Sequence, residues 1–148
     1  MSDNVNHPSH YLKAAVTIEP IELTSRLSSC YGQALQYILR APYKGNKIED
    51  LKKALFYLQK ADEICDYPRI YSNNLTFAYL TVFRLHHQDD LFVWLLDALF
   101  VDSTPWDLSE KRRKCSYFEV TEESLGRTID ILSDHIWKLE AIPEESRE

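Results

Sequence analysis

Residues 47–64, KIEDLKKALFYLQKADEI, carry the clearest helical pattern in the sequence. Their apolar side chains recur three and four positions apart, which is the spacing that places them on one face of an α-helix. That stripe consists of Ile48, Leu51, Leu55 and Leu58. The lysines and the first glutamate of the segment fall outside the stripe. The segment therefore predicts an amphipathic helix with one face turned to a core.

Helical patterns also precede this segment. Residues 19–27 carry Pro20 where it suits the first turn of a helix. Residues 30–40 have apolar side chains at helical spacing, and Ser28 or Ser29 is placed to cap that helix. The order predicts two short helices that lead into the helix of residues 47–64.

The second half of the chain continues the helical pattern. Asn73 or Asn74 is placed to cap a helix that runs through Leu85. Thr121 is placed to cap the last helix, in which residues 125–139 carry apolar side chains at spacings of four and three. The whole pattern predicts an all-α fold, a compact helical domain of about five to six helices with an extended N-terminal arm.

Two segments do not fit a long helix. Residues 102–118 contain Pro105 and the basic run KRRK at 111–114, and we predict a loop with at most one helical turn. Strands are left open at residues 15–18 and 117–120. The basic run is a candidate contact for an acidic partner or nucleic acid, although a short run of this kind is more often a solvated loop.

Composition restricts the class of protein. The net charge of −6 argues against a general affinity of the whole molecule for nucleic acid, because an acidic chain repels the phosphate backbone. The three cysteines show no C-x-x-C spacing, which favours neither a zinc site nor a disulfide framework. The apolar stretch at 91–101 is interrupted by Asp97 and is too short to span a bilayer. We therefore expect no membrane partner and no metal site.

Two clusters near the N-terminus carry side chains that are capable of metal binding or acid–base chemistry. His7 and His10 flank Pro8, but a zinc site needs a third protein ligand, so a polar arm is the alternative interpretation. Glu19 and Glu22 lie three apart on one helical face. They are either a metal-binding or acid–base pair, or favourable charges at a helix N-terminus, and the second interpretation is the simpler one.

Two further clusters flank the turn before residue 47. Arg40 has the planar fork that suits a phosphate, and Lys44 offers a mobile charge; both also suit the C-terminal end of a helix. Glu49 and Lys53 form an i, i+4 pair, which stabilises a helix, or else the lysine faces a bound anion. Gly32 lies inside a helical pattern, where it allows the close approach of a ligand or another helix.

Taken in order, these motifs resemble the SaV-like family of phage proteins. The matching blocks are His-Pro-x-His-Tyr from residue 7, Ile-Glu-x-Ile-Glu from residue 18, Tyr-Ile-x-Arg from residue 37, Lys-Gly from residue 44, and Glu-Asp-Leu-x-Lys-Ala-x-x-Tyr-Leu from residue 49. The resemblance covers residues 7–58. It divides the chain into a SaV-like region, residues 1–66, and a helical extension packed on it, residues 67–148, within one structural domain.

The resemblance implies a phage-encoded, nucleotide-binding protein of the host cytoplasm. One branch of the family phosphorylates deoxynucleoside monophosphates without a Walker motif, which implies a nucleoside triphosphate as phosphate donor, with no assignment of magnesium. By the same resemblance His7 and His10 are candidate catalytic groups. The residues implied for ligand or phosphate binding are Tyr11, Tyr37, Arg40, Lys44, Glu49, Asp50 and Lys53.

The sequence departs from the family pattern at Gln33 and Gln36, where the family has asparagine and lysine. Loss of that cation weakens the case for phosphoryl transfer more than the case for anion binding. The alternative is therefore a non-catalytic protein that binds a host defence protein or sequesters a nucleotide-like ligand. A helical pyrophosphatase fits less well, because Lys52 stands where its second metal-binding motif needs an acid.

Aromatic residues and broad apolar helix faces bear on partners. We expect a homo-oligomer, because helices with wide apolar faces bury them against other copies. Trp106 is the tryptophan most suited to an interface, whereas Trp94 and Trp137 are expected to pack in the core.

Overall fold

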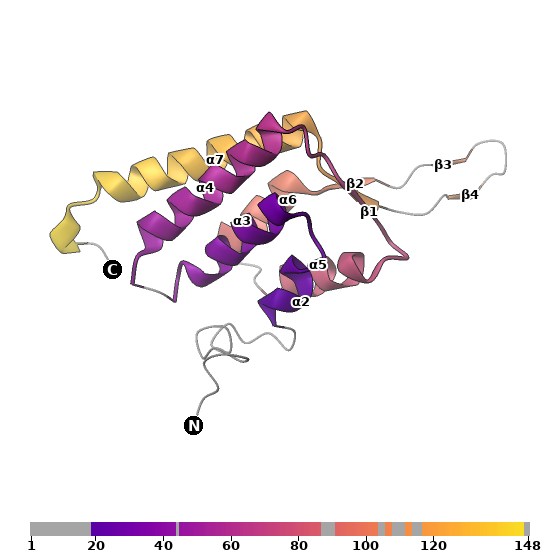
Figure 1. Ribbon diagram of the computed structural model, residues 1–148, viewed down its shortest axis with the longest axis horizontal. Coiled ribbons are helices and arrows are strands. Elements are labelled where there is room, and N and C mark those ends of the chain that lie inside the picture. The colour runs from indigo at the N-terminus through magenta and orange to yellow at the C-terminus, as the bar shows by residue number, and fades with distance from the viewer. Residues whose placement is uncertain are drawn as a thin grey trace, which may run out of the picture.

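Six α-helices and a small sheet make up the described part of the computed structural model, which is residues 19–43, 45–86, 91–103, 106–107, 112–113 and 117–146 (Figure 1). The mostly helical fold is confirmed. The helices are α2 (Pro20–Thr24), α3 (Ser29–Arg40), α4 (Lys47–Glu63), α5 (Leu75–His86), α6 (Leu91–Leu99) and α7 (Glu122–Ala141), followed by a 3₁₀ turn η1 (Glu144–Ser146).

Helix α4 is packed between α3 and α7. Helices α4 and α7 lie side by side and run in opposite directions, and α3 lies against the other side of α4 (Figure 1). Helix α6 packs on α3 and α7, while α2 and α5 pack on each other. Every one of the six helices contributes a buried leucine to one continuous core. The segments before and after residue 66 thus share a single set of buried side chains.

Gly32 lets α3 lie directly against the end of α2. A Cβ atom built at Gly32 would lie 2.6 Å from the backbone oxygen of Thr24, closer than atoms of this kind approach. Two interpretations of this glycine were open, a ligand or a helix, and the neighbour found in the structure is helix α2.

Helix α4 ends in a motif that normally contains glycine. Cys65 has a positive φ of 56°, its N–H bonds to the carbonyl of Asp62, and the N–H of Asp66 bonds to the carbonyl of Ala61. These are the two hydrogen bonds of the Schellman motif. The buried Tyr31 then donates its hydroxyl proton to the carbonyl of Asp66, so the end of α4 is tied to the start of α3.

Ser28 occupies the N-cap of α3, as the sequence allowed, but its side chain caps nothing. Its hydroxyl donates instead to Oδ2 of Asp66 at 2.6 Å. The Asn74 cap of α5 is confirmed, because its Oδ1 accepts the N–H of Thr76 at 2.9 Å.

The predicted loop at residues 102–118 is wrong in its main feature, because this segment contains strands. Strands β2 (Val101–Ser103) and β1 (Arg69–Tyr71) both pair antiparallel with a central strand β5 (Tyr117–Glu119). Beyond them β3 (Trp106–Asp107) pairs with β4 (Arg112–Arg113) in a two-stranded ladder. Part of the basic run is therefore in a strand, and the strand left open at residues 117–120 is real.

The sheet is anchored to the helices by Phe118 of β5. Its ring is buried and stacks on Phe77 of α5, with centroids 4.1 Å apart and planes 12° apart. The guanidinium of Arg84 lies 5.2 Å from the centre of the same ring. The neighbours Tyr117 and Glu119 point to the other face of the strand, as alternation requires.

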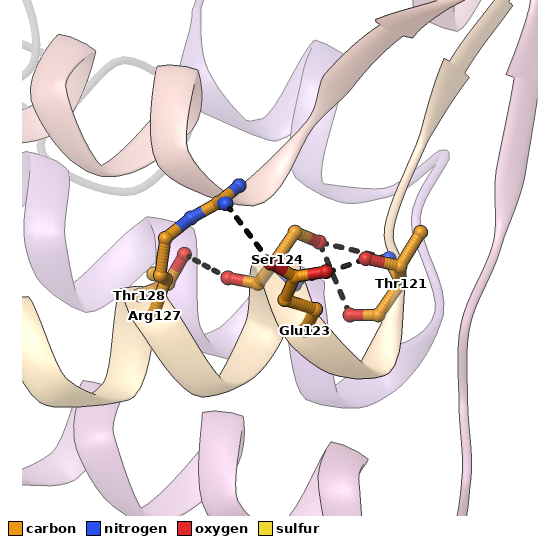
Figure 2. Close-up of polar contacts among 5 residues, drawn as sticks. All are labelled: Thr121, Glu123, Ser124, Arg127 and Thr128. Carbon is orange, nitrogen blue, oxygen red and sulfur yellow. Dashed lines mark hydrogen bonds and ion pairs between the residues drawn. The ribbon is translucent and has the colours of Figure 1, made fainter.

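The N-terminus of α7 is a capping box (Figure 2). The Thr121 hydroxyl oxygen accepts the N–H of Ser124 at 2.9 Å, and the Ser124 hydroxyl oxygen accepts the N–H of Thr121 at 2.8 Å. One turn later, buried Thr128 donates its hydroxyl to the carbonyl of Ser124. The cap predicted at Thr121 is confirmed, and its buried hydroxyls are satisfied.

Two tryptophans contradict the expectation that they pack in the core. Trp94 on α6 is 57% exposed and Trp137 on α7 is 67% exposed. Both helices bury another face, through leucine and isoleucine side chains, and the tryptophans lie outside those stripes. The side chain of Trp106 lies outside the described part of the chain.

Candidate functional site

Helices α3 and α4 form an antiparallel pair that brings several of the predicted site residues together. Tyr37 and Arg40 lie one turn apart near the end of α3. Asp50, Lys53 and Tyr57 lie at spacings of three and four near the start of α4, so they share one face. We call these five residues the Tyr37 cluster.

Arg40 and Asp50 form a two-point ion pair within this cluster. Nη2 of Arg40 lies 2.9 Å from Oδ1 of Asp50, and Nε lies 3.2 Å from Oδ2. The Asp50 side chain is only 5% exposed, whereas that of Arg40 is 29% exposed. A paired fork of this kind fixes both position and orientation. Asp50 therefore holds the guanidinium in one place.

The Tyr37 ring is where the cationic and aromatic groups of the cluster meet. The guanidinium carbon of Arg40 lies 4.4 Å from the ring centre, and Nζ of Lys53 lies 5.6 Å from it. Tyr57 stacks on Tyr37, with centroids 6.1 Å apart and planes 13° apart. Phe56 in turn packs its ring at 80° to that of Tyr57. The arrangement is a half-buried aromatic surface carrying two cations.

Glu49 completes the charge balance around Lys53. Its Oε1 lies 3.0 Å from Nζ of Lys53, one helical turn apart. The hydrogen bond that Lys53 donates to Glu49 raises the pKa of Lys53, so this ammonium is fully charged at neutral pH. Each of the two cations thus has a carboxylate partner, and the i, i+4 helix pair expected from the sequence is present.

The structure accordingly brings together Tyr37, Arg40, Glu49, Asp50 and Lys53. The other predicted site residues lie outside the described residues, namely His7, His10, Tyr11 and Lys44. Tyr57 belongs to the last of the matching blocks but was not among the predicted ligand-binding residues, and Phe56 was not predicted at all. The spacing of Tyr57, seven from Asp50 and four from Lys53, places it on the same helical face and is the signal that could have added it to the site.

The carboxylates Glu19 and Glu22 lie at the N-terminal end of α2, away from the Tyr37 cluster in the sequence. Glu19 is the N-cap residue of α2 and Glu22 lies in its first turn. No group of three or more potential metal ligands occurs among the described residues. These positions suit the positive end of a helix dipole.

Gln33 and Gln36, where the sequence differs from the SaV-like pattern that it resembles, lie on α3 before the cluster. Gln33 is exposed, and Gln36 lies one turn before Arg40 and is half-buried. A lysine at residue 36 would stand on the Arg40 side of the helix, so its absence removes one cation from this neighbourhood.

A second polar arrangement was missed entirely from the sequence. His135 of α7 and Lys47 of α4 both line a mainly apolar cavity near the α3–α4 turn. These residues are 88 positions apart along the chain. Nothing in the local pattern of either segment indicates that they meet.

Comparison with known proteins gives a family match for the first part of the chain. Residues 5–59 match the model of a family described as a protein of unknown function, DUF3310. The match includes α3 and most of α4, and it ends just after the Tyr37 cluster. No curated protein and no solved structure matches the chain. Among the described residues, no helix is long and apolar enough to cross a membrane.

Proposed function

We propose that this chain is a phage-encoded protein of the host cytoplasm that binds a nucleoside monophosphate at the Tyr37 cluster. The observation that supports this most is the assembly of Tyr37, Arg40 and Lys53 into one surface from two helices. Arginine and lysine are the usual partners of phosphate, and an aromatic face can stack on a base. All the residues of the cluster fall within the segment that matches the family.

The ion pair with Asp50 gives Arg40 a fixed orientation before any ligand arrives. Preorganised donors lose less entropy on binding than flexible ones. The same pair also has a structural role, which any test must separate from ligand binding. Lys53 is the better probe, because its side chain is 43% exposed and its truncation leaves no buried charge behind.

Phosphoryl transfer is the reaction proposed for this site if the protein is an enzyme. The sequence has no G-x-x-x-x-G-K-[ST] motif, so a phosphate site would consist of side chains and helix ends. His7 and His10 would bind phosphate or act as acid–base groups near neutral pH. A nucleoside triphosphate would donate the phosphoryl group.

The test is calorimetric titration with a panel of nucleoside and deoxynucleoside monophosphates. Lys53→Met should weaken binding by about tenfold, the loss of one charge-assisted contact. Lys60→Met is a matched control, because Lys60 lies on the same helix, is 45% exposed and also pairs with a nearby glutamate. It should leave affinity unchanged. Absence of binding across the panel, or equal losses in both variants, would refute the proposal.

A second candidate function is a non-catalytic protein that binds a host protein. Three exposed aromatic side chains favour it, namely Phe56, Trp94 and Trp137. Aromatic residues are enriched at protein interfaces. The same surfaces would serve the homo-oligomer expected from the sequence. Light scattering on the purified protein and on the variants Trp94→Lys and Trp137→Lys tests self-association directly. If one variant no longer forms the oligomer, the interface lies at that tryptophan.

A further inference from the structure

A cavity of about 300 Å³ lies between the end of α3, the start of α4, the start of α6 and one side of α7. Its walls are mainly apolar. They include Ile38, Leu39, Leu51, Leu91 and Phe92. Three of the lining residues carry a polar side-chain group, namely Tyr43, Lys47 and His135. We call this the His135 pocket, and it is distinct from the Tyr37 cluster.

The imidazole of His135 is under-satisfied. Its Nε2 atom is buried and has no hydrogen-bond partner among the described residues. A buried polar atom without a hydrogen bond costs free energy in the folded state, and native proteins rarely retain one without a reason. A partner that enters the pocket and bonds to Nε2 would remove this cost.

The charges around His135 leave the pocket positive. Burial lowers the pKa of His135, and the nearby ammonium groups of Lys47 and Lys138 lower it further, against a weaker opposite effect of Asp134. The imidazole is therefore neutral at neutral pH. Lys138 is paired with Asp134 at 2.8 Å, whereas Lys47 makes no ion pair with any described residue. Lys47 is thus the cation that a ligand entering this pocket would meet.

We propose that the His135 pocket binds a small amphipathic monocarboxylic acid, with the carboxylate at Lys47 and His135 and the apolar body among the leucine, isoleucine and phenylalanine side chains. Apolar walls with a few convergent polar groups are typical of small-molecule sites. The volume corresponds to about ten water molecules, which is room for a ligand of about ten non-hydrogen atoms. Octanoate and 3-phenylpropionate are probes of this size.

The polar end of the ligand determines which compounds the His135 pocket prefers. A neutral imidazole can donate one N–H to a carboxylate oxygen while the ammonium of Lys47 supplies the countercharge. A primary amide of the same shape keeps the hydrogen bond but loses the attraction to Lys47. The uncharged octanamide should therefore bind at least tenfold more weakly than octanoate.

The test is a titration of the full chain with both acids, followed by calorimetry and by the NMR signals of the His135 ring. Saturable binding that moves the His135 resonances is expected. Lys47→Met should weaken it at least tenfold. Lys138→Met is the matched control, since Lys138 also acts on the His135 charge but does not line the pocket, and it should change affinity less than twofold.

His135→Phe separates ligand binding from simple packing. The proposal expects this variant to stay folded and to lose affinity for octanoate about tenfold. Unchanged affinity in His135→Phe, equal losses in Lys47→Met and Lys138→Met, or no saturable binding of either acid would each overturn the proposal. The inference does not depend on nucleotide binding at the Tyr37 cluster.

Discussion

Replacement of Gly32 by alanine should destabilise the protein even though alanine is the better helix former. The added Cβ would lie 2.6 Å from the backbone oxygen of Thr24 and 3.5 Å from its carbonyl carbon. A backbone atom cannot turn aside as a side chain can, so α2 and α3 must move apart. Overpacking of this kind costs about 1–3 kcal/mol.

The gain in helix propensity offsets part of this cost. Alanine is favoured over glycine inside a helix by about 1 kcal/mol. Because the obstacle is backbone, we expect the clash to fall at the upper end of its range, which leaves a net loss of about 1–2 kcal/mol in the free energy of unfolding.

Gly126 in α7 is the matched control. A Cβ there would meet nothing within 4 Å, so Gly126→Ala should raise the free energy of unfolding by about 0.5–1 kcal/mol. Urea unfolding followed by circular dichroism measures both variants, provided that the slope with denaturant stays the same. If Gly32→Ala were as stable as Gly126→Ala, the close packing of α2 on α3 would be refuted.

Three further predictions concern single side chains. Arg40→Ala should cost roughly 3 kcal/mol in urea unfolding, because it leaves Asp50 buried and unpaired, and the double variant with Asp50→Leu should recover much of it. Cys65→Gly should stabilise by about 0.5–1 kcal/mol, because glycine tolerates the positive φ; a destabilisation would contradict this. The folded-state pKa of His135 is lowered, so its neutral form supports folding fully above about pH 6.5 and this contribution is lost as the pH falls toward the lowered value. His135→Phe should flatten that pH dependence, and an NMR titration giving a normal pKa for His135 would oppose it.

Much of the helical architecture was predictable because it depends on local patterns. The stripes of α4 and α7 follow from apolar spacing, and the caps at Thr121 and Asn74 follow from side chains that can bond to the backbone a few residues ahead. The cap expected at Ser28 failed because Asp66, 38 positions away, competes for the hydroxyl.

Features that depend on distant partners could not be predicted. Strand β5 pairs with β1 and β2 through backbone groups, and only Phe118 contributes an anchoring side chain from its short sequence. Trp94 and Trp137 are exposed because smaller apolar side chains on the same helices already fill the core. Tryptophan occurs both in cores and on surfaces, so the residue type alone does not show which of the two it occupies.

The candidate site shows the same division. The spacing of Asp50 and Lys53 on one helix follows from the sequence, as does the closeness of Arg40 across a short turn. The stacking of Tyr57 on Tyr37 depends on how α3 and α4 cross, and the meeting of Lys47 with His135 depends on how α4 packs on α7. Those two arrangements could therefore be recognised only in the structure.

The most direct test of the central claim is to locate a bound nucleotide by NMR. The protein is labelled with nitrogen-15 and titrated with the deoxynucleoside monophosphate that binds best in calorimetry. If the nucleotide binds at the Tyr37 cluster, the amide signals of Tyr37, Arg40, Asp50, Lys53 and Tyr57 shift most, and these shifts saturate with the calorimetric affinity. Shifts centred on other helices, or no saturable shift with any monophosphate, would contradict the central claim.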